Sequence, residues 1–337
     1  MLSRPRLLSA SLILPIALLS ACGSSGKSTS PPPASGSATG SAASSAAPSG
    51  TTVAGIDGVT VQGAFGAKPT VTVPDKAAPA ALAQQVVTEG SGAIVARGDT
   101  LVANYSGQTW APKSGKPNIF DSSFDRGAPA AFVIGAGRVI PGWDKTLVGK
   151  HLGSRVLLAI PPAEGYGSAG QSQANISGTD TLVFVVDLVA AYKPNASAPG
   201  TAVPNAPGAG LPKVANVVGK APAILSTAGV KAPAKPTGTL LVTGSGEPID
   251  AKKTLVLQVV ETDLATGKKS QSTWGKAPQT VAARNVLSVA TVLAGKKVGS
   301  RALVLAPAIA ATPASSSQAA QPATPPQVLV VDVVGQF

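Results

Sequence analysis

The sequence predicts an α+β protein in which two similar, strand-rich domains follow a disordered tether. The body of the chain contains two copies of one ordered set of segments. Each copy consists mostly of short β-branched or apolar runs bounded by Gly and Pro, with one brief helical signal. We therefore expect each domain to be an antiparallel sheet that covers one short helix, and 337 residues suit about two such domains.

The amino terminus is typical of a secretory signal. Arg4 and Arg6 precede an apolar run at residues 7–19 that is too short to span a bilayer stably. The run ends in Leu19-Ser20-Ala21-Cys22, which resembles the lipobox of bacterial lipoproteins, and Cys22 is the only cysteine. This resemblance implies that residues 1–22 are a lipoprotein signal and that Cys22 is lipidated. The lack of a second cysteine supports it, because Cys22 can form no intramolecular disulfide.

Residues 23–52 are almost entirely Ser, Gly, Ala, Pro and Thr. This composition cannot bury a core, so we expect a disordered tether that lifts the folded part off the lipid surface. An anchor at Cys22 implies an extracytoplasmic protein on the outer face of the bacterial cell membrane.

The two copies keep their segments in the same order at a spacing of roughly 150 residues, which a tandem duplication explains. We expect domains at residues 53–192 and 211–337, separated by a linker at 193–210 that is rich in Pro, Ala and Gly. The matching segments are 66–71 with 219–224, 88–92 with 243–247, 100–102 with 254–256, 149–155 with 295–301, and 182–187 with 328–332.

The strands of the first copy are expected at residues 100–105, 155–160 and 181–188. A short helix is expected at 142–147, directly after Pro141, with its counterpart at 286–293. Alternating apolar residues at 59–74 and at 214–230 predict one or two extra strands attached to each domain, and either edge of the sheet is open to them.

Charge and composition exclude several classes of function. The net charge is +12, yet Lys and Arg are scattered without the blocks that mark a nucleic-acid arm. The expected use is a solvated basic surface, and the alternative is loose attraction to an anionic membrane. One His and one Cys exclude a His/Cys metal cluster and count against a Ser-His-Asp triad, and we expect no metal and no cofactor.

Aromatic residues are scarce, at three Trp, three Tyr and six Phe, and four of them fall between residues 118 and 143 beside Asp121 and Arg126. The ordinary use of such a Trp or Phe is core packing, and the ordinary Asp–Arg pair lies on the surface. Their concentration instead predicts most of the lining of one apolar pocket.

The first copy resembles the FKBP-type peptidyl-prolyl cis-trans isomerase domain over roughly residues 82–192. The resemblance rests on five motifs in the family's order: Val102–Gly107, Phe120–Ser123, Val139–Trp143, Gly165–Gly167 and Leu182–Phe184. It implies a strongly bent antiparallel sheet wrapped on the helix near Trp143, with a cavity between them. The implied lining is Tyr105, Phe120, Asp121, Val139, Ile140, Trp143, Tyr166, Ile176 and Phe184.

By the same resemblance the catalytic residues are Asp121, Tyr166 and Trp143. Trp143 forms the floor of the cavity, Asp121 and Tyr166 lie at its rim, and Arg126 pairs with Asp121. Rotation about a peptide bond has a barrier of about 18–20 kcal/mol because resonance stiffens the C–N bond. A twisted imide has lost its charge separation, so an apolar site favours it over the planar ground state without any nucleophile.

The chain departs from the family at three places. It has Ala130 where an aromatic is frequent, the loop at 168–180 keeps only Ile176 of a bulky aliphatic pair, and the loop at 108–118 is longer. These departures affect the expected depth of the pocket and the peptide preference.

In the second copy Val259, Leu329 and about Val289 replace Tyr105, Phe184 and Trp143, and the loop at 308–326 replaces the Gly-Tyr-Gly element. We expect a degenerate FKBP-like fold without a cleft, serving a structural or peptide-binding role.

The sequence therefore predicts a lipid-anchored peptidyl-prolyl isomerase, active in the first copy only. Its expected partners are Pro-containing segments of exported proteins, and not nucleic acid. The alternative is a non-catalytic chaperone or adaptor that grips Pro-containing segments, and the intact site of the first copy favours catalysis. A solute-binding lipoprotein would need two α/β lobes with long helices, for which the sequence has no signal.

Overall fold

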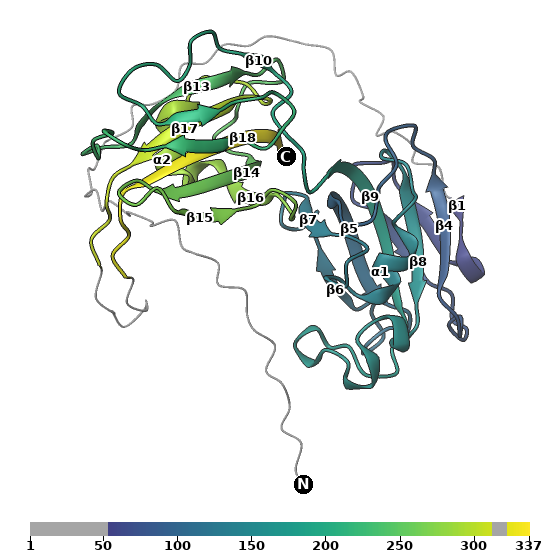
Figure 1. Ribbon diagram of the computed structural model, residues 1–337. Helices are drawn as coiled ribbons and strands as arrows, with labels where there is room; N and C mark the ends of the chain where they lie inside the picture. Colours follow the sequence, from purple (N-terminus) through teal and green to yellow (C-terminus); the bar gives the residue numbers. More distant parts are fainter. Residues whose placement is uncertain (1–52, 312–321) are drawn as a thin grey trace, which may run out of the picture. The chain divides into compact units, whose positions relative to one another are not determined.

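The computed structural model describes residues 53–311 and 322–337 (Figure 1). The predicted signal, Cys22 and the predicted tether lie outside the described residues, as does much of the loop at 308–326. No helix in the described part is long and apolar enough to cross a membrane.

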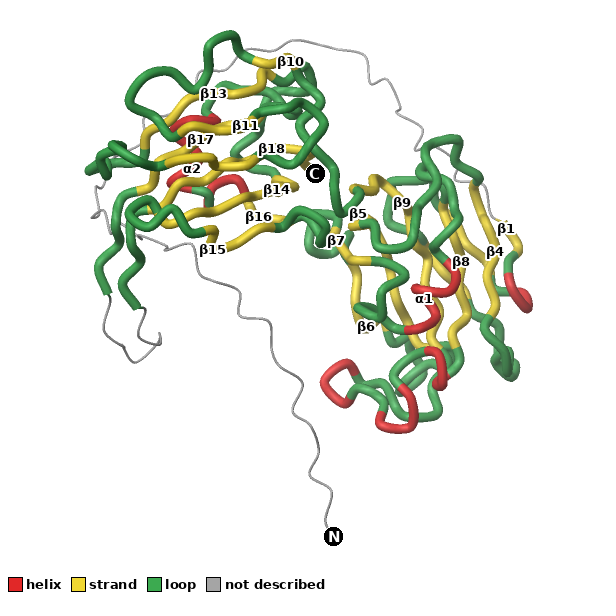
Figure 2. Tube along the Cα trace, in the orientation of Figure 1, coloured by secondary structure: helices red, strands yellow, loops and turns green. Residues whose placement is uncertain are grey.

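Residues 53–192, here called the first body, are built on a six-stranded antiparallel sheet. The strand order is β4-β8-β9-β5-β6, and β7 pairs with the other end of the long strand β5 (Figure 2). The strands are β4 (Ala83–Thr88), β5 (Thr100–Thr109), β6 (Ile119–Ser122), β7 (Ala130–Val133), β8 (Arg155–Ile160) and β9 (Leu182–Tyr192).

The central strands of this sheet are continuous apolar runs because both of their faces are covered. Along β8, Leu158 packs in a cluster with the helix, whereas Leu157 packs in a second cluster on the opposite face. The strand predicted at 155–160 coincides with β8, whereas β5 and β9 continue four residues beyond the predicted ends. Both extensions pair along most of their length, so cross-strand contacts lengthen them.

One face of the sheet carries the helix α1 (Pro141–Thr146), which was predicted one residue later. Pro141 lies in the first turn, where its fixed φ suits a helix start. Gly142 lets the helix approach the sheet, because a Cβ there would lie 2.7 Å from Ile160. The short 3₁₀ turns of this body are η1 (Ile56–Gly58), η2 (Pro162–Glu164), η3 (Gly167–Ala169) and η4 (Ser172–Ala174).

The predicted extra strands join neither edge of this sheet. They form a separate sheet of β1 (Val53–Ala54), β2 (Thr60–Gln62) and β3 (Thr70–Thr72). Val59, Val61 and partly buried Val71 share one cluster with Leu157 and Val183, on the face opposite α1. The first body therefore has three layers: the small sheet, the large sheet and the helix.

Residues 198–337, here called the second body, repeat this strand order: β13-β17-β18-β14-β15, with β16 on β14. Its helix is α2 (Leu287–Leu293), one residue shorter than predicted, and it packs with η5 (Ala283–Asn285). The strands are β10 (Thr201–Ala202), β13 (Thr237–Thr243), β14 (Thr254–Asp263), β15 (Lys269–Ser272), β16 (Gln279–Ala282), β17 (Arg301–Ala306) and β18 (Gln327–Gln336).

The second body also has a separate small sheet, the hairpin of β11 (Lys213–Ala215) and β12 (Ala223–Ser226). Its Val214 and Ile224 pack against buried Leu303 and Val330 of the large sheet. The predicted linker at 193–210 is not wholly irregular, because β10 pairs with the end of β13.

Candidate active site

Five aromatic rings from four strands and the helix meet on the helix side of the first body. Trp143 of α1 lies at the centre, in edge contact with the rings of Tyr105, Phe132 and Phe184, at 5.4, 5.1 and 5.3 Å between centroids. Phe120 extends the group through Phe184, at 5.4 Å. Edge-to-face contacts at these distances favour a fixed arrangement, so the rings form one ordered apolar surface.

A glycine in β5 makes room for this group. Gly107 pairs across the ladder with Phe184, and a Cβ on Gly107 would lie 2.5 Å from the Phe184 ring and 2.9 Å from Phe120. Real Cβ atoms do not approach so closely, so the two rings occupy the space that a side chain would need. The glycine of the predicted motif Val102–Gly107 is thus required by the site itself.

Three polar groups form one edge of the aromatic surface. The Tyr105 hydroxyl donates to Asp121 at 2.5 Å and accepts a hydrogen bond from Arg126 at 2.7 Å. Arg126 also pairs with Asp121, as predicted, and its guanidinium lies 5.4 Å from the centre of the Tyr105 ring. Burial and the hydrogen bond to Asp121 raise the pKa of Tyr105 to about 12, so it is a neutral donor at physiological pH.

The motif Phe120–Ser123 is held against β5 by its last residue. Ser123 Oγ accepts from the backbone N–H of Tyr105 at 2.8 Å, and the Ser123 N–H donates to the Tyr105 carbonyl at 3.0 Å. Ser123 is fully buried. These bonds fix the backbone that carries Phe120 and Asp121, which explains a serine at a position with no direct part in the site.

The loop before α1 is shaped by Asp144. Its two carboxylate oxygens accept from the backbone N–H groups of Gly135 and Gly137, each at 2.6 Å. Both glycines have positive φ, of 73° and 68°. The loop continues into Val139 and Ile140, which pack partly buried against the core cluster.

Tyr166 and Ile176 lie in the segment of 3₁₀ turns between β8 and β9. Ile176 is buried in the aromatic core cluster, and its backbone forms a two-way bridge with Gln171. Tyr166 is 38% exposed. Burial and the charge of Asp121 raise the pKa of Tyr166, so its hydroxyl also stays protonated at physiological pH.

The lengthened loop at 108–118 holds the loop at 168–180 in place. Asn118 Nδ2 donates to the carbonyls of Asn175 at 3.1 Å and Ala174 at 3.4 Å. Lys113 forms an ion pair with Asp180 at 2.7 Å. The segment that carries Ile176 is therefore anchored from outside the aromatic group.

The indole N–H of Trp143 is buried and has no hydrogen-bond partner among the described residues. Buried polar groups are nearly always paired, so such a donor needs an explanation. The Trp274 indole of the second body is buried and unpaired in the same way, so an unpaired indole does not by itself mark a binding site. Among the described residues, no group of three His, Cys, Asp or Glu side chains is placed to hold a metal ion.

Comparison with known proteins assigns this region. The family model described as FKBP-type peptidyl-prolyl cis-trans isomerase matches residues 92–189. The "FK506-binding protein" of Streptomyces anulatus is 40% identical over 123 residues, which are 36% of this chain and 96% of the relative. The chain belongs to the FKBP-type peptidyl-prolyl cis-trans isomerase family.

Two further matches cover smaller shares of the known proteins. "Peptidyl-prolyl cis-trans isomerase FKBP15-1" of Arabidopsis thaliana is 44% identical over 94 residues, which are 28% of this chain and 58% of the relative. The crystal structure of FkpA from Escherichia coli is 39% identical, covers 33% of this chain and 48% of that chain, and has a TM-score of 0.29.

The enzyme class predicted from the sequence is confirmed by this membership, as is an FKBP fold with an antiparallel sheet and few helices. The matched region 92–189 contains every predicted residue of the FKBP site. The structure brings eight of the nine together: Tyr105, Trp143, Ile176 and Phe184 are buried in one cluster, Phe120, Val139 and Ile140 pack against it, and Asp121 contacts Tyr105 at its edge. The ninth, Tyr166, is exposed and makes no hydrogen bond or ring contact with the others in the described structure.

Sequence reasoning missed two parts of the FKBP site, Phe132 and Gly107. Phe132 is one of the four clustered aromatics, but its contact with Trp143 depends on the pairing of β7 with β5, which was not predicted. The role of Gly107 depends on its register opposite Phe184, which no local pattern shows.

The corresponding positions of the second body have a different chemistry. Val259 donates its N–H to Thr273 Oγ1 at 2.8 Å, just as Tyr105 does to Ser123, so the two backbones correspond. Glu261 pairs with Leu329 where Gly107 pairs with Phe184. The described residues that fill the cluster around Val259 and Val289 are all aliphatic.

Proposed function

We propose that the first body catalyses cis-trans exchange of X–Pro bonds in exported polypeptides, without a covalent intermediate. The observation that carries this proposal is the group of five aromatic rings centred on Trp143, bordered by the polar groups of Tyr105, Asp121 and Arg126. It combines an apolar floor with a few fixed polar groups, as a site for a small hydrophobic ring requires.

The chemistry follows from the peptide bond itself. In the planar ground state, resonance separates charge between the carbonyl oxygen and the nitrogen, and the barrier to rotation is about 18–20 kcal/mol. The twisted transition state loses this separation and is less polar. A site that replaces water with aromatic surface therefore favours the twisted state over the planar one. The proline ring would lie against Trp143.

Two polar groups would orient the substrate in this site. The exposed hydroxyl of Tyr166 is available to donate to a substrate carbonyl, since it stays protonated and the described structure gives it no partner. Asp121 is fixed by Tyr105 and Arg126, so its charge stays at one edge of the pocket. In this proposal it orients the rim and does not act as a base.

The second body is proposed to be an FKBP-like fold that lacks the catalytic cleft. Its strand order and its helix repeat those of the first body, which supports a duplicated domain. Its aliphatic cluster and the carboxylate of Glu261 at the position of Gly107 support the loss of the cleft. A structural or peptide-binding role follows.

The proposed setting is the outer face of a bacterial cell membrane. Its support is the basic and apolar signal of residues 1–22 and the lipobox-like end at Cys22. An isomerase held there by lipid would meet Pro-containing segments of proteins that have just crossed the membrane.

An exchange assay tests the catalytic proposal. A fragment of residues 48–337 should accelerate cis-trans exchange of an X–Pro peptide, measured by exchange NMR. Trp143→Ala and Tyr166→Phe should each lower the rate, with circular dichroism as the control for folding. A fragment that binds Pro-peptides without accelerating exchange would instead establish the adaptor function. Exchange catalysed by a separately produced second body would contradict its assignment as inactive.

A further inference from the structure

The positive charge of the chain is concentrated in the second body. The first body has ten Lys and Arg and ten Asp and Glu, whereas residues 198–337 have 13 basic and five acidic residues, a formal charge of +8. No acidic residue occurs between Asp187 and Glu247. The asymmetry points to an anionic partner for part of the second body.

Residues 211–236, here called the basic hairpin, contain β11 and β12 and have basic residues but no acidic ones. Its four lysines are all exposed, and none has an ion pair with any described residue. They are Lys213, Lys220, Lys231 and Lys235.

The basic hairpin also exposes large apolar side chains. Leu225 is 65% exposed, Val217 is 53% exposed and Val218 is 36% exposed, and all three lie within nine residues of the chain. Val214 and Ile224, by contrast, pack on the large sheet. The exposed residues therefore cover nothing in the described structure.

The backbone between β11 and β12 is held by hydrogen bonds from an arginine of the large sheet. The fully buried Arg301 donates to Asn216 Oδ1 at 2.9 Å, to the Val217 carbonyl at 3.3 Å and to the Lys220 carbonyl at 2.8 Å. A surface held in this way loses little backbone entropy when it binds a partner.

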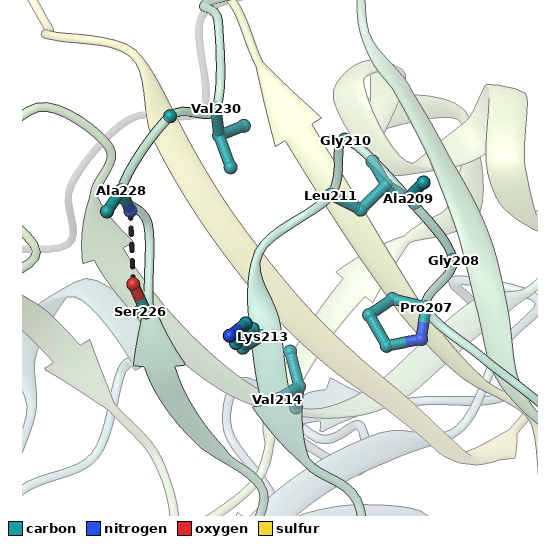
Figure 3. Close-up of a pocket in the computed structure, with 11 residues that line it drawn as sticks. Pro207, Gly208, Ala209, Gly210, Leu211, Lys213, Val214, Ser226, Ala228 and Val230 are labelled. Atoms are coloured by element: carbon teal, nitrogen blue, oxygen red, sulfur yellow. Dashed lines mark hydrogen bonds between the residues drawn. The ribbon is translucent and has the colours of Figure 1, made fainter.

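A shallow hollow of about 490 Å³ lies beside the hairpin. Figure 3 shows Lys213 and Val214 on one side, Ser226 to Val230 on another, and the segment from Pro207 to Leu211 facing them. The only charged residue in this lining is Lys213. The hollow is therefore compatible with a small anionic group.

The small sheet of the first body shows that these features do not come with the fold. Its cations are balanced: Lys68 pairs with Asp125 at 2.5 Å, and Lys76 lies 3.9 Å from Asp57. It exposes one large apolar residue, Phe65, at 38%. The basic hairpin combines unpaired lysines with exposed aliphatic side chains, and its counterpart does not.

We propose that the basic hairpin docks the second body onto an anionic lipid bilayer. The lysines would contact lipid phosphates, and Val217, Val218 and Leu225 would enter the boundary between headgroups and acyl chains. Aliphatic side chains projecting from a tight hairpin suit a deformable lipid surface, whereas a protein partner would need a pocket shaped for them. The contact is independent of isomerase activity and adds to any lipid attached at Cys22.

Vesicle co-sedimentation tests this proposal with the fragment of residues 48–337, which lacks Cys22 and contains all four hydrophobic clusters. It should bind vesicles of mixed phosphatidylglycerol and phosphatidylcholine, bind pure phosphatidylcholine much more weakly, and lose affinity as salt rises. Each lysine near an anionic surface contributes roughly fivefold in affinity, so Lys213→Gln with Lys231→Gln should weaken binding about 25-fold.

Charge-matched and apolar controls locate the contact. Lys252→Gln with Lys297→Gln removes the same charge from segments outside the hairpin and should have little effect. Leu225→Ser should weaken vesicle binding more than Ile309→Ser, an exposed aliphatic residue elsewhere in the second body. Isomerase activity should be unchanged in every variant, which separates this test from that of the proposed function.

Three outcomes would overturn the proposal. Equal binding to neutral and anionic vesicles would exclude the headgroup contact. Equal losses for the two lysine pairs would show that overall charge, and not the basic hairpin, controls binding. Tighter binding to soluble polyglutamate than to anionic vesicles would identify an acidic polymer as the partner.

Discussion

In the first body, the sheet face that carries the helix holds five aromatic rings, and in the second body the corresponding face is filled by Leu and Val side chains. The opposite faces are much more alike. In both bodies a small separate sheet covers that face with aliphatic residues. The two bodies therefore share their framework and differ in the site.

A buried ion pair shows how closely the framework is kept. Arg155 and Arg301 are both 0% exposed, and they bind Asp187 at 2.6 Å and Asp332 at 2.5 Å. Each guanidinium also binds backbone carbonyls of the small sheet's turn: Gly63 and Ala67 for Arg155, and Val217 and Lys220 for Arg301. Each pair thus fastens the small sheet to the large one.

Removing these arginines should have the largest effect on stability. Arg155→Ala or Arg301→Ala leaves a buried carboxylate and several carbonyls unpaired, and such changes destabilise by about 3–5 kcal/mol. If the bodies unfold separately, urea denaturation should show Arg155→Ala shifting the transition of the first body and Arg301→Ala that of the second. A shift below about 1 kcal/mol for either variant would mean that the pair is dispensable.

The next largest effect is expected at Gly107. Gly107→Ala forces a Cβ against Phe184 and Phe120, and overpacking of this kind costs about 1–3 kcal/mol. Because the displaced rings belong to the site, kcat/KM for an X–Pro peptide should fall by about tenfold, equivalent to about 1.4 kcal/mol. The matched control is Glu261→Ala in the second body, which should leave the activity unchanged.

The cross-strand partners of Gly107 and Glu261 could not be predicted from the sequence. The register places Gly107 opposite Phe184 and Glu261 opposite Leu329, and this pairing decides which residue lies beside the aromatic rings. The strands were predictable because β-branched and apolar runs mark them locally, and the site residues were predicted from the resemblance to the FKBP family. The pairing depends on residues about 75 positions apart, which no local pattern specifies.

The burial of Arg155 and Arg301 could not be predicted from the sequence either. Gly-Ser-Arg recurs in both copies and was predicted as part of the duplication, yet nothing in the sequence shows that the arginine is buried. Charged residues are almost never fully buried unless paired, so a surface position was the ordinary expectation. Asp187 and Asp332, each on the next strand along the chain and directly opposite its arginine in the sheet, supply the pairing.

A smaller effect is expected where the first body anchors the loop at 168–180. Asn118→Ala removes the hydrogen bond to the Asn175 carbonyl, a contribution of about 0.5–1.5 kcal/mol. The loop carries Ile176, so KM for X–Pro peptides should rise several-fold while kcat changes little. Asn175→Gly keeps the carbonyl and adopts the positive φ of this residue (53°) without strain, so it serves as a control. A lowered kcat with unchanged KM would contradict a positioning role.

The smallest effect is expected at Glu261. Burial raises the pKa of this carboxyl above its ordinary value, so the folded second body binds a proton more readily than the unfolded chain. The protonated form is the better accommodated one. The contribution of this carboxyl to stability is therefore fully present below the unfolded-state pKa and is lost as pH rises through the folded-state pKa. At neutral pH the ionised carboxylate destabilises the second body.

Glu261→Gln removes this titration. The melting temperature of the second body should rise relative to the unsubstituted chain at pH 7, and the gap should shrink as pH falls below about 4, where Glu is protonated in both states. Calorimetry at several pH values measures it. A difference in melting temperature that does not change with pH would mean that the Glu261 carboxyl stays solvated in the folded second body. Glu247→Gln is the matched control, because the side chain of Glu247 lies in the same body and is 75% exposed.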